Sequence, residues 1–318
     1  MQLTNEKVVD RRSFMAAGLA AAMIGQAAEA TADDAWPPII DTHQHLWDRS
    51  KFRLEWIEKD SVLDRDFLSE DYAKATQGLG VVQAVYMEVD VVPAQHSAEA
   101  TYISDLCRAK TTPTRAAVIS GRPDSPDFTR YLDQFKGNTF VKGLRQVLHG
   151  PATPPEHCLK PEFVKGIREL GRRGLSFEIC QREADLPNGV KLARQCDETQ
   201  FILDHCGNPN VKARPGVAWM KAIDDLAACR NVSAKISGVI AGIDREKDIA
   251  TQLRPFVEHV WNAFGPDRVV FGGDWPVCLL GGTYSQWVTA LRQIAEGRSK
   301  ADQRKLFHDN AVRIYRLA

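Results

Sequence analysis

The sequence predicts an α/β fold, a (β/α)8 TIM-like barrel that forms a single domain over residues 36–318, after an N-terminal export signal. Eight short apolar runs rich in β-branched residues follow one another along the chain. Amphipathic segments long enough to cross over lie between several of them, which is typical of a parallel sheet covered on both faces. No G-x-G-x-x-G motif follows the first run, so an open doubly wound sheet has less support.

The composition is that of an ordinary globular protein. The 318 residues are 44% hydrophobic and 26% charged, and 41 Lys plus Arg balance 41 Asp plus Glu. This composition excludes collagen, a disordered tail protein and a polytopic membrane protein. The neutral charge balance also argues against a nucleic-acid partner, because nucleic-acid binders usually carry a basic excess.

Residues 1–30 have the pattern of a twin-arginine-type signal peptide. Arg11 and Arg12 precede a weakly apolar core at 16–24 and an A-x-A site that ends at Ala30. The core is too short to span a bilayer as a permanent anchor. We therefore expect the twin-arginine export machinery as a partner, cleavage near Thr31 and a periplasmic mature protein. The alternative is a weak first helix of the domain.

The eight expected strands are separated by helical segments such as 98–109 and 162–173. Residues 48–69 follow the first strand and are expected to cover the mouth of the barrel as a lid. The seven cysteines are irregularly spaced and odd in number, which argues against a disulfide framework. In chain order, the strands are expected at Ile39–Asp41, Val81–Met87, Arg115–Ser120, Thr139–Leu144, Leu175–Ile179, Gln200–Leu203, Val232–Ile236 and Val269–Phe271.

The first strand ends in two histidines. In barrels of this kind, the site lies at the C-terminal ends of the strands. His43 and His45 are two residues apart, so an extended strand directs both rings to the same side. Two imidazoles aimed at one point are what a divalent metal ion requires.

Polar residues also occur at the ends of other expected strands. A carboxylate at this rim can ligate a metal ion and can take a proton from water. Each residue also has a structural alternative: an ion pair, a helix cap, or a hydrogen-bonded core histidine. Five other histidines lack a strand end and are not assigned to the site. The candidates at the strand ends are Glu88, Arg145, Glu178, His205 and Asp274.

Three segments together resemble the amidohydrolase superfamily, in the branch that contains sugar-lactone hydrolases such as fuconolactonase. They are the DTHQHLW of 41–47, the LDHCGNP of 203–209 and the FGGDWPVC of 271–278. The NAVRIY of 310–315 is similar to the closing helix of that family. The resemblance covers residues 39–317 and implies a distorted (β/α) barrel.

The resemblance also implies roles for the site residues. Asp274 would be the general base, His205 would polarise the substrate carbonyl, and Arg145 would meet a carboxylate or hydroxyl of the substrate. One divalent ion is expected, Zn²⁺ from its mixed N and O ligands, held by His43, His45, Glu88 and Asp274. Glu178 stands where many members have a histidine or carboxylated lysine, which disfavours a binuclear centre. Together with Arg145, the expected substrate-binding residues are Glu178, Trp47 and Trp275, although the two tryptophans could equally pack at the rim.

The leading functional hypothesis is therefore hydrolysis of a small polar lactone by water. A second is metal-dependent decarboxylation of an unsaturated or aromatic acid. A third is an exported sugar-binding barrel without catalysis, which the presence of both His43 and Asp274 disfavours. The identity of the lactone and the oligomeric state, including a homo-oligomer, stay open.

Overall fold

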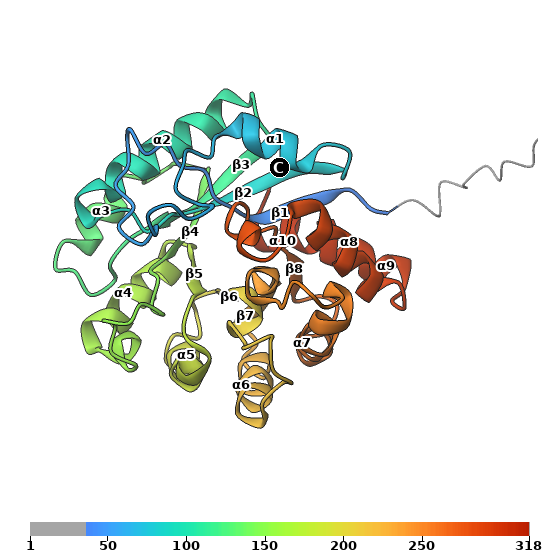
Figure 1. Ribbon diagram of the computed structural model, residues 1–318. Helices are drawn as coiled ribbons and strands as arrows, with labels where there is room; N and C mark the ends of the chain where they lie inside the picture. Colours follow the sequence, from blue (N-terminus) through green and yellow to red (C-terminus); the bar gives the residue numbers. More distant parts are fainter. Residues whose placement is uncertain (1–35, 318) are drawn as a thin grey trace, which may run out of the picture. The chain divides into compact units, whose positions relative to one another are not determined.

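The computed structural model describes residues 36–317 and confirms the expected barrel. Eight parallel strands pair in chain order, from β1 to β8 (Figure 1). Each lies within three residues of its expected bounds. The expected signal peptide at 1–30 lies outside the described residues. The strands are β1 (Ile39–Gln44), β2 (Val81–Met87), β3 (Thr114–Ser120), β4 (Val141–Arg145), β5 (Ser176–Ile179), β6 (Phe201–Leu203), β7 (Val232–Ile236) and β8 (Val269–Phe271).

The barrel closes just beyond the last residues of β1 and β8. The two strands do not form a continuous ladder, but Gln44 bridges to Trp275 in parallel fashion. The amide of His45 donates to the carbonyl of Trp275 at 2.8 Å, and the amide of Asp274 donates to the carbonyl of His43 at 2.7 Å. Closure therefore brings the histidine motif against the segment that carries Asp274.

Helices surround the sheet, with one or more after each strand (Figure 1). Among residues 36–317, no helix is long and apolar enough to cross a membrane. The helices are α1 (Ser69–Thr76), α2 (His96–Ala109), α3 (Phe128–Asp133), α4 (Pro161–Arg172), α5 (Leu186–Gln195), α6 (Val217–Ala227), α7 (Ile249–Phe264), α8 (Tyr284–Ala295), α9 (Lys300–Arg304) and α10 (Asn310–Tyr315).

Helix α10 closes the N-terminal end of the barrel. Its Tyr315 and the following Leu317 pack with buried side chains of β1, β2, β3, β6 and β8. Asn310 Nδ2 donates to the carbonyl of Val269, the first residue of β8, at 2.8 Å. Side chains from α10 thus fill the N-terminal end of the barrel interior. The candidate site lies at the opposite, C-terminal end.

The expected lid, residues 48–69, is a loop up to the start of α1 at Ser69, and it is anchored on the connection between β2 and α2. Trp47 and Phe67 bridge its two ends. The indole of Trp56 donates to the carbonyl of Val89 at 2.8 Å, and the Gln95 side chain donates to the carbonyl of Lys51 at 2.9 Å. All seven cysteines are free and buried.

Gly166 lets α4 approach the loop after β3, and this contact generates a prediction about stability. A Cβ at this position would lie 2.2 Å from the carbonyl oxygen of Pro123. We expect Gly166→Ala to lower the free energy of unfolding by about 1–2 kcal/mol, because overpacking costs about 1–3 kcal/mol and the higher helix propensity of Ala returns at most about 1 kcal/mol. Urea denaturation of the purified protein measures the change.

The matched control is Gly297→Ala, since a Cβ there meets no atom within 4 Å. The control should leave the free energy of unfolding nearly unchanged. Equal unfolding curves for the two variants would contradict the close packing of α4.

Candidate active site

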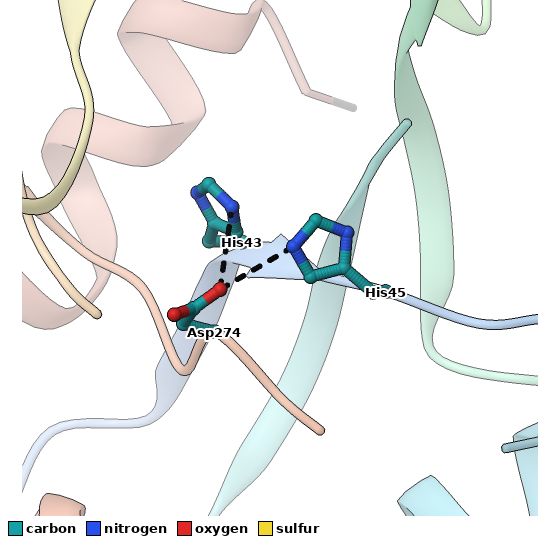
Figure 2. Close-up of side chains that lie close together, drawn as sticks. All are labelled: His43, His45 and Asp274. Carbon is teal, nitrogen blue, oxygen red and sulfur yellow. Dashed lines mark ion pairs between the residues drawn. The ribbon is translucent and has the colours of Figure 1, made fainter. Parts of the chain in front are cut away.

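Three histidines converge on one oxygen of Asp274 at the C-terminal end of the barrel. Asp274 Oδ1 lies 3.3 Å from His45 Nε2, 3.6 Å from His43 Nε2 and 4.0 Å from His205 Nε2. Figure 2 shows the rings of His43 and His45 turned toward this carboxylate. The four residues that the sequence placed at the ends of β1, β6 and β8 therefore form one cluster.

A hydrogen bond to the backbone fixes the tautomer of His45. Its Nδ1 lies 2.9 Å from the carbonyl oxygen of Met87, which can only accept, so Nδ1 carries the proton. The lone pair of Nε2 then faces the carboxylate oxygen of Asp274 at 3.3 Å. Two acceptors this close need a cation between them. The pair is therefore suited to hold a metal ion or a proton.

Asp274 is held in place by the carboxylate of Asp41, on β1. Asp41 Oδ1 accepts from the amide of Gly273 at 2.7 Å. Its Oδ2 accepts from the hydroxyls of Tyr72 at 2.8 Å and Tyr284 at 3.0 Å. Burial raises the pKa of Asp41, although these hydrogen bonds oppose the shift. A Cβ at Gly273 would lie 2.5 Å from Asp41 Oδ2, so this position requires glycine.

Backbone strain is concentrated at the strand ends that carry the site. Non-glycine residues with positive φ cost on the order of 1–3 kcal/mol, and they cluster where function requires an unusual direction of the side chain. Asp274 has φ 53° and His205 has φ 52°. Three of the remaining positive-φ residues also follow β2 or β6: Asp90, Cys206 and Asn208.

Lys235, on β7, lies behind His43 with two carboxylates. Its Nζ is 3.0 Å from Asp204 Oδ1, 3.0 Å from Glu178 Oε2 and 3.2 Å from His43 Nδ1. Burial alone would raise the pKa of Asp204, but the charge of Lys235 holds it well below its usual range. Burial and the charge of Lys235 keep the pKa of His43 well below 6.5, so its ring is neutral.

Arg145, at the end of β4, reaches the same cluster from the other side. Its NH1 lies 3.3 Å from His43 Nε2 and 3.3 Å from Asp204 Oδ2. Its Nε donates to Glu88 Oε1 at 2.6 Å. A guanidinium can bind a carboxylate through paired hydrogen bonds, so the expected contact of Arg145 with a carboxylate or hydroxyl of the substrate stays a prediction.

Glu88 lies in a different place from the one expected for a metal ligand. One of its oxygens accepts from Arg145, and the other accepts from Ser120 Oγ at 2.7 Å and from the amide of Asp90 at 2.7 Å. Both oxygens are therefore engaged by donors. Glu88 orients Arg145 instead of joining the cluster around Asp274.

Glu178 is not at the surface of the site either. It is fully buried between Lys235 and the hydroxyl of Tyr315, which donates to its Oε1 at 2.9 Å. Burial raises its pKa to about 7, and Lys235 partly offsets this effect. A side chain in this position supports the network below the site and offers no surface to a substrate.

Trp47 and Trp275 occupy the packing position, which was one of the two alternatives. They are 0% and 2% exposed. Both rings meet Phe67 edge to face, at centroid distances of 5.1 Å and 5.3 Å, and the indole of Trp47 donates to the carbonyl of Arg65. Neither ring has a free face on which a sugar could stack.

Asp41, Asp204, Lys235 and Ser237 were not assigned roles from the sequence. Ser237, directly after β7, lies 2.9 Å from His205 Nδ1 and orients that ring. A lysine inside the apolar run of β7 was the available signal, because lysine is almost never fully buried unless it is paired. His259, one of the five histidines that were not assigned to the site, lies on α7 and pairs with Asp224 of α6, outside the site.

Comparison with known proteins supports the resemblance to amidohydrolases that the sequence motifs indicated. Residues 40–317 match the family model described as amidohydrolase. An uncharacterized protein, y4mH, of Sinorhizobium fredii is 30% identical over 88% of this chain and 98% of its own length. An L-fucono-1,5-lactonase of Burkholderia multivorans is 28% identical over 87% of this chain and 96% of its own length.

A solved structure extends the comparison to three dimensions. A crystal structure of an amidohydrolase from Burkholderia multivorans with bound zinc superposes with a TM-score of 0.80. It is 25% identical in sequence, and the match covers 88% of this chain and all of that one. Because the family model spans nearly the whole described barrel, the chain belongs to the amidohydrolase family and is a hydrolase.

Proposed function

We propose that this hydrolase opens a small polar lactone of the sugar-acid type. The observation that carries the proposal is the convergence of His43, His45 and His205 on the carboxylate of Asp274, with Arg145 beside them. The similarity to L-fucono-1,5-lactonases and to an L-rhamnono-gamma-lactonase supports this substrate class.

In the proposed reaction, Asp274 takes a proton from water while the water oxygen attacks the ring carbonyl carbon. The carbonyl oxygen gains negative charge, which the guanidinium of Arg145 and the imidazole of His205 stabilise. The ring C–O bond then breaks, and Asp274 returns the proton to the departing oxygen. The product is the open hydroxy acid, so water is consumed and no other reactant is needed.

We further propose one divalent ion, most simply Zn²⁺, held by His43, His45 and Asp274. The ligand atoms of these three residues lie within 4.8 Å of one another, and the facing lone pairs of His45 and Asp274 suit a cation. When bound, such an ion supplies Lewis-acid polarisation of the carbonyl and a lower pKa of water. Glu88, which Arg145 and Ser120 engage, is not among the proposed ligands.

The role of Asp274 generates the first functional prediction. Asp274→Asn keeps the shape of the side chain but removes the base. We expect turnover of a sugar-acid lactone to fall about 10²-fold or more, because general-base catalysis contributes about 10²–10⁴-fold, with folding retained. A screen of purified protein against aldonolactones, followed by steady-state kinetics of the variant, measures the effect.

His259→Asn is the control for this experiment. His259 lies on α7 and pairs with Asp224, so turnover should stay close to that of the parent. Near-parental turnover by Asp274→Asn would refute the mechanism. Release of CO₂ from an unsaturated acid, without lactone hydrolysis, would favour the decarboxylase. Binding of a sugar lactone without its turnover would favour a sugar-binding barrel.

The second functional prediction concerns metal content. We expect elemental analysis to find about one divalent ion per chain. His45→Asn should lose most of this metal because it removes the lone pair that faces Asp274, whereas His259→Asn should retain it. Two ions per chain, or full activity in chelator with no metal bound, would contradict the proposal.

We also propose that the protein is exported to the periplasm by the twin-arginine route. The motivation is the Arg11-Arg12 pair ahead of a weakly apolar core and the A-x-A site that ends at Ala30. Replacing both arginines by lysine should block export, and the mature protein should begin near Thr31. Cell fractionation and N-terminal sequencing test this. Undiminished periplasmic accumulation of the lysine variant would exclude the route.

A further inference from the structure

A cationic cavity lies at the end of the barrel opposite the candidate active site. Its volume is about 520 Å³, and Lys110, Arg115, Lys142 and Arg316 line it. Arg115 and Lys142 are the second residues of β3 and β4, and Arg316 directly follows α10, which closes the N-terminal end. No Asp or Glu is among the lining residues.

Within residues 36–317, none of these four cations pairs with a carboxylate. Arg115 NH1 donates to the carbonyls of Thr112 and Thr114. Lys142 Nζ donates to the carbonyl of Arg316 at 3.0 Å, and Arg316 NH2 donates to the carbonyl of Lys142 at 3.4 Å. Neutral carbonyls therefore orient Arg115, Lys142 and Arg316, and no carboxylate of the described part of the chain balances their charges.

The adjoining groove differs in part. It has a volume of about 820 Å³ and shares Lys142 and Arg316 with the cavity, but it also has arginines with acidic partners. Arg173 lies 2.8 Å from Asp133 and 2.7 Å from Glu169, and Arg172 also pairs with Glu169. The charges of Arg172 and Arg173 are therefore balanced by carboxylates, whereas no carboxylate lines the cavity that holds Lys110, Arg115, Lys142 and Arg316.

Positively charged side chains that gather in a concave site repel one another, and a bound anion relieves this repulsion. Burial lowers the pKa of the Lys142 ammonium, and the nearby charge of Arg316 lowers it further. Phe140 and Leu317 add apolar surface to the wall. The cavity volume falls in the range of about 300–1,000 Å³ typical of small-molecule sites.

We propose that this cavity binds a small organic polyanion that carries phosphate or carboxylate groups on a short carbon skeleton. The guanidinium forks of Arg115 and Arg316 match the paired oxygens of either group. Lys110 and Lys142 contribute point charges, and Phe140 and Leu317 contact the skeleton. The site is separate from the proposed lactonase centre and does not depend on it.

Calorimetric titration of the full chain at low salt, with inorganic pyrophosphate and with citrate, tests the proposal. We expect one molecule of at least one probe to bind per chain, with an affinity that falls as salt screens the charges. The relative affinities of the two probes show whether phosphate or carboxylate groups fit better. The Lys142→Gln/Arg316→Gln variant should bind about 10-fold or more weakly, a change of about 1.4 kcal/mol.

Two control proteins locate the binding. Lys74→Gln removes an exposed lysine of α1, which does not line the cavity, and should retain the parental affinity. Asp274→Asn should also retain it, which separates this cavity from the active site. Because the double variant alters the partly buried Lys142, Lys110→Asn is the second test. Lys110 is exposed and has φ 57°, a conformation that Asn tolerates, so folding should be kept and the affinity should fall a few-fold.

Absence of binding by both probes would overturn the proposal. So would binding that both the double variant and Lys110→Asn leave unchanged, or that Asp274→Asn abolishes. None of these outcomes involves lactone turnover. The proposal of anion binding can therefore be refuted while the proposed lactonase activity stands, and the lactonase proposal can be refuted while anion binding stands.

Discussion

The site depends on one buried carboxylate, that of Asp41. It accepts a backbone hydrogen bond from Gly273 and hydroxyl hydrogen bonds from Tyr72 and Tyr284. These contacts tie β1 to the segment after β8 and to two outer helices at once. The barrel has no continuous ladder between β1 and β8. This carboxylate, together with the short backbone contacts beside it, is therefore what places Asp274 against the histidines.

A second buried network determines the electrostatics of the same site. Lys235 and Arg145 bracket His43, and Asp204 pairs with both cations. Buried charges are costly unless they are paired and hydrogen-bonded, so these residues must be positioned together. The result is a neutral imidazole next to a fixed guanidinium, an environment whose charges need little rearrangement when negative charge develops on a substrate.

The sequence predicts more of the fold than of the site. Strand positions follow from apolar runs that are buried on both faces. The side chains of His43 and His45 point to the same side of β1 because this follows from local strand geometry. The roles of Glu88 and Glu178 depend on partners from distant strands, Arg145 and Lys235, which no local pattern reveals. The burial of Trp47 and Trp275 likewise depends on Phe67, at the far end of a loop. Asp41 stood in the quoted motif, but its function exists only after the barrel closes.

Barrel closure also has a consequence for the order in which the enzyme becomes competent. His43 belongs to the first strand of the barrel and Asp274 follows the last one, so the reaction centre is divided between the two ends of the domain. A chain that ends before β8 would thus hold both imidazoles of β1 without Asp274, the base that we propose. On the proposed mechanism, hydrolysis requires that the last strand has docked, and activity therefore reports that the barrel is complete.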